Sequence, residues 1–245
     1  MSSAAVKPTP LVHQISPTES DRPTSLRGVR RPLVLAHRGA SRAAAENTPE
    51  AFRLALALGA DGVELDVRRA ARGALVVHHD SVLNGHPVRQ LARPPLPSLA
   101  VALNASAGGL VDVELKTDGD EPEAAATALC SYLRRRNGRD RLLTSSFDPA
   151  ALRTVRKLRP DLPTALVVEH ESELAAALQE ASQAGHAALH PEWRLVDRAL
   201  IKRARTLGLE LRAWTVNDPD EVRRLAHLGV DGLITDVPDV ALAAL

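Results

Sequence analysis

An α/β fold, the (β/α)8 barrel, is the fold class that the sequence predicts. Eight short apolar runs rich in β-branched residues alternate with amphipathic stretches, and 245 residues with 44% apolar content suit one large barrel better than two small domains. Such alternation indicates parallel strands joined by right-handed crossovers. An open doubly wound sheet is the alternative, but it normally carries a glycine-rich phosphate turn, which this sequence lacks.

The eight runs expected to form the barrel strands are LVLAHR (33–38), GVELDVRR (62–69), LVDVELK (110–116), LLTSSF (142–147), TALVVE (164–169), AALHPE (187–192), ELRAWTV (210–216) and GLITDV (232–237). Between them, segments 49–60 and 148–160 have the apolar spacing of helices. In the second helix, Asp148 and Pro149 occupy the N-cap and first helical positions, and Pro160 closes it.

One further run breaks the alternation. Segment 74–80, ALVVHHD, follows the second strand after a gap too short for a helix, so we expect a hairpin that turns near Arg72 and Gly73. Folding the chain about this turn brings positions 78–79 opposite Asp66. The prediction is therefore an extra hairpin strand after the second barrel strand, with a histidine beside an acidic residue.

Composition bounds the organisation and the partners of the chain. We expect a disordered tail over residues 1–31, which is rich in Ser, Pro and Thr, and a single barrel domain over 32–245. No apolar run is long enough to span a membrane and the N-terminus has no apolar core typical of a secretion signal, so a cytoplasmic protein without integral membrane contact is expected. A net charge of +1 argues against nucleic-acid binding. The lone Cys130 excludes a disulfide framework and a cysteine-based zinc site.

Acidic residues share one face of two predicted strands. In GVELDV, Glu64 and Asp66 are two residues apart, and in LVDVELK the same spacing joins Asp112, Glu114 and Lys116. Active sites of barrels lie at the carboxyl ends of the strands. Three converging carboxylates, Glu64, Asp66 and Glu114, therefore predict a site for a hard divalent cation, Mg²⁺ or Ca²⁺. The alternative is a set of solvent-exposed acids paired with the many arginines.

Histidines and cations flank these acids. His37 ends the first strand, whereas His78 and His79 end the hairpin strand and point to opposite faces, so only one of the two can enter the site. Histidine can give or take a proton near neutral pH, although either one could instead be structural. Arg38 and Lys116 are the nearest cations and could bind phosphate oxygens. A metal, two histidines and two cations favour phosphoryl transfer over amide or glycoside hydrolysis.

Six segments then occur in one order over about 33–240, namely LAHRGASRAAAENTPEAFRLALALGADGVELDV, VVHHD, VDVELK, SSFDPAAL, AWTVND and GVDGLITDVPD. The motifs HRG, ENT, ELD and HD are a specific signature only in combination. On these segments the chain resembles the glycerophosphodiester phosphodiesterase family. The resemblance implies a barrel of the phospholipase-C-like phosphodiesterase type.

The resemblance also implies roles for the acids and the histidines. It makes His37 and His79 the catalytic acid–base pair, which selects the second histidine of the hairpin strand. It makes Glu64, Asp66 and Glu114 the ligands of the divalent cation. Which histidine is the acid, and whether water or a hydroxyl of the substrate attacks, stays open at this point.

Five further residues are implied to contact phosphate or substrate. Arg38 and Lys116 are expected near the phosphate. Glu46 and Asn47 of ENT are expected on a loop at the site, where Glu46 contacts the metal, orients a ligand or merely fixes the loop. Trp214 is expected to line the glycerol pocket, with a core aromatic as the alternative.

The implied activity is the metal-dependent hydrolysis of a small glycerophosphodiester to sn-glycerol 3-phosphate and an alcohol. The loop after His79 departs from the family pattern, because it lacks an Asp-Arg-Thr-Thr stretch and is shortened. Loops of this kind set substrate choice. Two alternatives remain, a lysophospholipase D-type phosphodiesterase acting on lysolipids and a non-catalytic barrel that binds phosphate ligands. The oligomeric state is not predicted.

Overall fold

The computed structural model describes residues 31–136 and 140–245. The expected N-terminal tail, residues 1–31, therefore lies almost entirely outside the described residues. The barrel begins at β1 (Leu33–His37), and the single domain expected over 32–245 stays a prediction. No helix of the described ranges is both long enough and apolar enough to cross a membrane.

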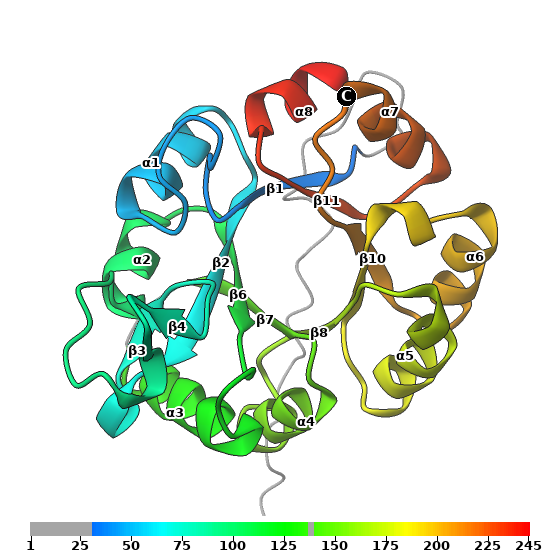
Figure 1. The fold of residues 1–245 in the computed structure, drawn as a ribbon. Helices are drawn as coiled ribbons and strands as arrows, with labels where there is room; N and C mark the ends of the chain where they lie inside the picture. Colours follow the sequence, from blue (N-terminus) through cyan, green and yellow to red (C-terminus); the bar gives the residue numbers. More distant parts are fainter. Residues whose placement is uncertain (1–30, 137–139) are drawn as a thin grey trace, which may run out of the picture. The chain divides into compact units, whose positions relative to one another are not determined.

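Eight parallel strands close into a barrel in the part of the chain that the structure describes (Figure 1). β1 pairs with β2 (Gly62–Arg69) on one side and with β11 (Gly232–Thr235) on the other, so the first and last strands are neighbours. The other strands, in chain order, are β6 (Leu110–Leu115), β7 (Arg141–Ser146), β8 (Thr164–Val168), β9 (Ala188–Pro191) and β10 (Glu210–Ala213). The predicted (β/α)8 barrel is confirmed, with β10 shorter than the expected run.

Helices form a ring around the strands (Figure 1). They are α1 (Pro49–Ala57), α2 (Leu99–Ala105), α3 (Pro122–Arg135), α4 (Pro149–Leu158), α5 (Glu171–Gln183), α6 (Arg198–Thr206), α7 (Pro219–Leu228) and α8 (Pro238–Ala244). The start of α4 follows the sequence prediction: Asp148 accepts hydrogen bonds from the amides of Ala150 and Ala151, and Pro149 occupies the first turn.

The expected hairpin is present. β3 (Leu75–Val77) pairs antiparallel with β2, and Val77 lies opposite Val67. The turn is a short 3-10 segment, η2 (Ala71–Gly73), in which Arg72 has φ 59° and Gly73 has φ 78°. The chain then passes through β4 (Val82–Leu83), β5 (His86–Pro87) and the 3-10 turn η3 (Val88–Gln90) before α2.

Alternation along β2 divides its side chains between the core and the site. Val63, Leu65 and Val67 are fully buried in a cluster of apolar side chains with Phe52 of α1. Because successive residues of a strand point to opposite faces, the intervening acids project into the barrel. Burial of the apolar face against the helices therefore fixes where the acids point, since a register slip of one residue would turn the valines into the barrel and the acids against the helices.

Candidate active site

Three carboxylates converge inside the barrel. Glu64 and Asp66 come from β2 and Glu114 comes from β6, where Glu114 pairs with Asp66. All three are buried, and one oxygen of each lies within 4.8 Å of the others. Burial, followed by the charges of Asp66 and Glu114, raises the pKa of Glu64 well above its ordinary value. Its Oε1 atom is buried without a hydrogen-bond partner among the described residues, so it is a candidate ligand atom for a cation.

Two side-chain cations already partly neutralise these acids. The Lys116 ammonium lies 2.6 Å from Glu114 Oε1 and 3.2 Å from Asp66 Oδ1, and Arg38 Nε lies 3.2 Å from Asp66 Oδ2. Burial on its own would raise the pKa of Asp66, but Lys116 and Arg38 hold it below its ordinary value. Burial raises the pKa of Glu114, and Lys116 opposes that rise. Asp66 is therefore the most firmly ionised of the three carboxylates.

The turn after β1 brings Arg38 to this cluster. Arg38 and Gly39 both have left-handed backbone angles, φ 56° and φ 84°. A Cβ on Gly39 would lie 2.7 Å from the carbonyl carbon of Ala51 in α1, so glycine is required here. The turn directs the Arg38 amide at Glu64 Oε2, at 3.0 Å. The backbone of this turn thus contacts one acid of the site while the Arg38 side chain contacts another.

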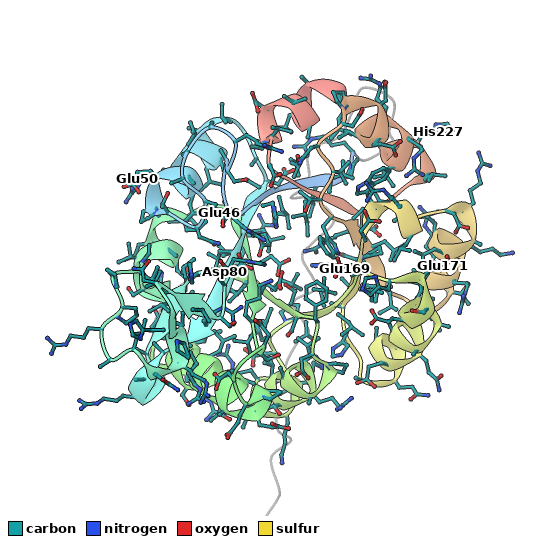
Figure 2. The ribbon with its side chains drawn as sticks, in the orientation of Figure 1. Glu46, Glu50, Asp80, Glu169, Glu171 and His227 are labelled. Carbon is teal, nitrogen blue, oxygen red and sulfur yellow. The ribbon has the colours of Figure 1, made fainter. Side chains whose placement is uncertain are left out.

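The loop before α1 orients both groups. Asn47 is buried, donates from Nδ2 to Asp66 Oδ2 at 2.8 Å and accepts from the Asp66 amide at 3.2 Å. Glu46 accepts from Arg38 Nη1 at 3.1 and 3.2 Å and lies at the opening of the barrel with Asp80 and Glu169 (Figure 2). Asn47 therefore fixes a carboxylate of the cluster. Glu46 fixes Arg38 and is not one of the three converging acids.

His37 is held by a residue that the sequence analysis did not single out. Its Nδ1 lies 2.7 Å from Asp236 Oδ1, and its Nε2 lies 4.0 Å from Glu64 Oε2. Asn217 and Ser41 also donate to Asp236, at 2.7 and 3.1 Å. Burial opposes ionisation of Asp236, but the hydrogen bonds from His37 and Asn217 lower its pKa to about 2. An ionised carboxylate only accepts, so Nδ1 carries the proton in this contact and Nε2 faces the acids.

A signal for Asp236 was present in the sequence. In a closed barrel the first strand lies beside the last, and here Ala36 pairs with Thr235. The residues that follow these two, His37 and Asp236, must then be neighbours at the carboxyl ends of the strands. Applying barrel closure to the run GLITDV would have found this partner.

The two adjacent histidines after β3 have different surroundings. The His78 amide donates to the Asp66 carbonyl at 3.0 Å, and His78 Nε2 is buried without a hydrogen-bond partner among the described residues. His79 is 38% exposed and shares a cleft of about 470 Å³ with Lys116. His79 also contributes to lowering the pKa of Asp66, after burial, which raises it, and the nearby cations. Of the pair, His79 is the one that lines this accessible cleft.

Trp214 lines one side of the space next to the acids. It follows β10, lies edge-to-face against Phe147 with ring centroids 5.6 Å apart, and donates from Nε1 to the His190 carbonyl at 2.9 Å. With His37 and Glu64 it lines a small cavity inside the barrel. The Lys116 ammonium lies 5.6 Å from the centre of the Phe147 ring. Trp214 therefore lines this cavity and packs on Phe147, and its contact with substrate stays a prediction.

A further group of buried polar side chains, which the sequence analysis did not foresee, lies next to the carboxylates. Asp112 Oδ1 accepts from Ser145 at 2.7 Å, and Asp112 Oδ2 lies 3.4 Å from His190 Nδ1. Burial raises the pKa of Asp112 to about 7, and burial followed by the charge of Arg212 lowers the pKa of His190 well below its ordinary value. These groups come from separate strands, so only the folded barrel brings them together.

Comparisons with known proteins identify the family of the chain and agree with its fold. The model of the "Glycerophosphoryl diester phosphodiesterase family" matches residues 37–90 and 104–240. A glycerophosphodiester phosphodiesterase of Caldanaerobacter subterraneus is 31% identical, over 86% of this chain and 96% of its own length. A phosphodiesterase of Oleispira antarctica, solved with its product sn-glycerol-3-phosphate, superposes with a TM-score of 0.78 at 26% identity and covers 87% of this chain and 96% of its own.

A putative glycerophosphoryl diester phosphodiesterase of Silicibacter pomeroyi gives a TM-score of 0.79 at 27% identity, covering 87% of this chain and 92% of its own. The family match includes the segments that carry His37, Glu64, His79 and Glu114. The family resemblance read from the sequence is thereby confirmed. The chain belongs to the glycerophosphoryl diester phosphodiesterase family.

Proposed function

We propose that this enzyme hydrolyses glycerophosphodiesters to sn-glycerol 3-phosphate and an alcohol, and that it depends on a divalent cation. The observation that carries the proposal is the convergence of three buried carboxylates with two side-chain cations, Arg38 and Lys116, beside His37. The relative of Oleispira antarctica, which was solved with sn-glycerol-3-phosphate, supports the choice of product.

The residues present fit Mg²⁺ or Ca²⁺. Glu64, Asp66 and Glu114 offer only oxygen donors, which hard cations prefer. Oε1 of Glu64 is buried without a partner among the described residues, and burial together with the charges of Asp66 and Glu114 raises the pKa of that side chain, so a cation bound there would stabilise its ionised form. These three acids would hold the ion, which supplies positive charge to a phosphate oxygen of the substrate when it is bound.

Arg38 and Lys116 bind the remaining charge of the phosphodiester. The hydrogen bonds from Arg38 Nη1 to Glu46 orient the guanidinium of Arg38. A planar guanidinium can donate to two phosphate oxygens at once. Lys116, which directly follows β6, contributes a second, localised positive charge beside Glu114. Because both cations sit in a largely buried site, they stabilise charge that develops on the phosphate more strongly than they would in water.

The histidines move the protons. One of the pair His37 and His79 takes the proton of the attacking hydroxyl as its oxygen bonds to phosphorus. The other gives a proton to the alcohol oxygen as its bond to phosphorus breaks. Asp236 keeps the His37 proton on Nδ1 and leaves Nε2 facing the site, so it acts as a positioning residue.

The test is release of sn-glycerol 3-phosphate from glycerophosphocholine with Mg²⁺ or Ca²⁺, and then with EDTA. We expect EDTA, His37→Ala and Glu64→Ala each to lower the rate by about 100-fold or more. Glu171→Gln, on the outer helical ring in Figure 2, serves as the control and should keep the wild-type rate. Lysophosphatidylcholine is the second substrate, and faster turnover of it would replace our proposal with a lysophospholipase D activity.

A further inference from the structure

Arg68 joins two segments that carry active-site residues. It lies on β2, and its side chain is 6% exposed. Its Nε donates to the carbonyl oxygen of His79 at 2.8 Å, and Nη2 donates to the same oxygen. On the loop after β6, Nη1 donates to the Asp118 carbonyl at 3.0 Å, and Nη2 reaches both Asp118 carboxylate oxygens at 2.8 and 3.0 Å. Every nitrogen of the guanidinium is therefore engaged.

His79 depends on this contact because its other supports are weak. β3 ends at Val77, and the His78 amide makes the last backbone hydrogen bond of this segment to β2, one residue before His79. Beyond His79 the chain forms two-residue strands and one 3-10 turn before the next α-helix. The His79 ring accepts or donates a hydrogen bond at 2.9 Å with Asp80, whose side chain is itself 71% exposed. An exposed partner of this kind holds an imidazole loosely.

We propose that Arg68 is a positioning residue, which holds the backbone of His79 in place relative to Lys116 and the carboxylate cluster. The inference rests on the proposed function, because that proposal makes His79 one of the two proton-transfer groups. The role requires the shape of arginine as well as its charge, since a planar fork can grip a carbonyl and a carboxylate together whereas a lysine ammonium is a single point. Misplacing a reacting group by about 1 Å costs on the order of 100-fold in rate.

The neighbouring arginine provides a matched control. Arg69 follows Arg68 on β2 and donates from Nε to Asp120 Oδ2 at 2.9 Å, on the same loop as Asp118. The contacts described for Arg69 do not include His79. Arg68→Lys and Arg69→Lys therefore change the same kind of ion pair between the same strand and loop, and only the first removes the grip on His79.

The experiment measures kcat and KM on glycerophosphocholine with saturating Mg²⁺, the melting temperature, and the NMR signal of the His79 ring, assigned by its absence in His79→Asn. We expect Arg68→Lys to lower kcat about 10- to 100-fold with KM changed less than about twofold, and to move the His79 signal. Arg69→Lys should keep kcat within about twofold and leave the signal in place. Equal losses in the two variants, or a wild-type kcat and His79 signal in Arg68→Lys, overturn the inference.

The NMR signal separates the inference from the proposed function. If the wild type proves inactive on glycerophosphodiesters but Arg68→Lys alone moves the His79 signal, the proposed function fails and the positioning role stands. Should Arg68→Lys not fold, Asp118→Asn replaces it, because it keeps the arginine and weakens its anchor. We then expect kcat to fall about 2- to 5-fold with a moved His79 signal, and wild-type values of both in folded Asp118→Asn would refute the role.

Discussion

Replacing Asp236 with asparagine removes the charge that faces His37 and keeps the size of the side chain. In the native protein the carboxylate accepts the Nδ1 hydrogen of His37 at 2.7 Å. An asparagine can turn its amide nitrogen toward the ring, which would favour the opposite tautomer and place the imidazole proton on Nε2. His37 would then present the wrong state to the substrate for one of its two possible roles, and it would lose the charge that stabilises its protonated form.

The structure bounds the size of this effect. The pKa of Asp236 falls from 3.8 to about 2, since its hydrogen bonds to His37 and Asn217 outweigh the opposing effect of burial. That difference corresponds to roughly 2 to 3 kcal/mol in favour of the carboxylate. His37 is one of three hydrogen-bond donors, so its share is about 1 kcal/mol, or roughly fivefold in rate. Loss of the tautomer adds to this value, and we expect kcat to fall about 100-fold.

The assay is steady-state hydrolysis of glycerophosphocholine, with kcat and KM determined separately. KM should change less than about twofold, because Asp236 acts through His37 rather than through the substrate. Asp239→Asn, which neutralises an exposed acid three residues later, is the control and should match the wild type. A kcat for Asp236→Asn within a factor of about two of the wild type, in a folded protein, would falsify the positioning role.

Three further predictions concern metal, pH and backbone. Mg²⁺ or Ca²⁺ should raise the melting temperature of the wild type but not of Glu64→Gln, and an equal rise in both would place the ion elsewhere. The pKa of Asp112 is about 7 when folded against an ordinary 3.8, so Asp112 alone should lower the stability by up to roughly 4 kcal/mol as pH rises from about 4 to 7; in urea unfolding, Asp112→Asn should show a fall over this range that is smaller than the wild-type fall by about that amount. Gly39→Ala should cost more than about 2 kcal/mol in urea unfolding because of the contact with Ala51, whereas Gly73→Ala, with open space around it, should cost about 1 kcal/mol; equal costs would contradict the steric argument.

Much of the fold was predictable because local signals agreed with the global arrangement. The apolar runs marked the strands, and the alternation of Glu64 and Asp66 with valine and leucine determined which face of β2 carries the acids. The hairpin followed from a gap too short for a helix. In each case the information lies within about ten residues of sequence, so no knowledge of distant contacts was needed.

What the sequence left open depends on contacts between distant segments. Asp236 becomes a partner of His37 only once the barrel closes, and Asp112 meets His190 only across the interior. The sequence does not distinguish Arg68 from the many other arginines, because no neighbouring residue indicates its hydrogen bond to the His79 carbonyl. Strand parity could not choose between His78 and His79, since that choice depends on how the chain leaves β3.

The pairing of β1 with β11 has a consequence for how the enzyme comes into being. His37 and Asp236 are separated by 199 positions, so a growing polypeptide makes the histidine long before its carboxylate. At about 5 to 20 residues per second, that delay is roughly 10 to 40 s. Until β11 arrives, one edge of β1 is free to pair with other nascent chains. The pairing of β1 with β11 is therefore formed last. It covers the free edge of β1 and so protects it from misassembly, and it also completes the support of His37.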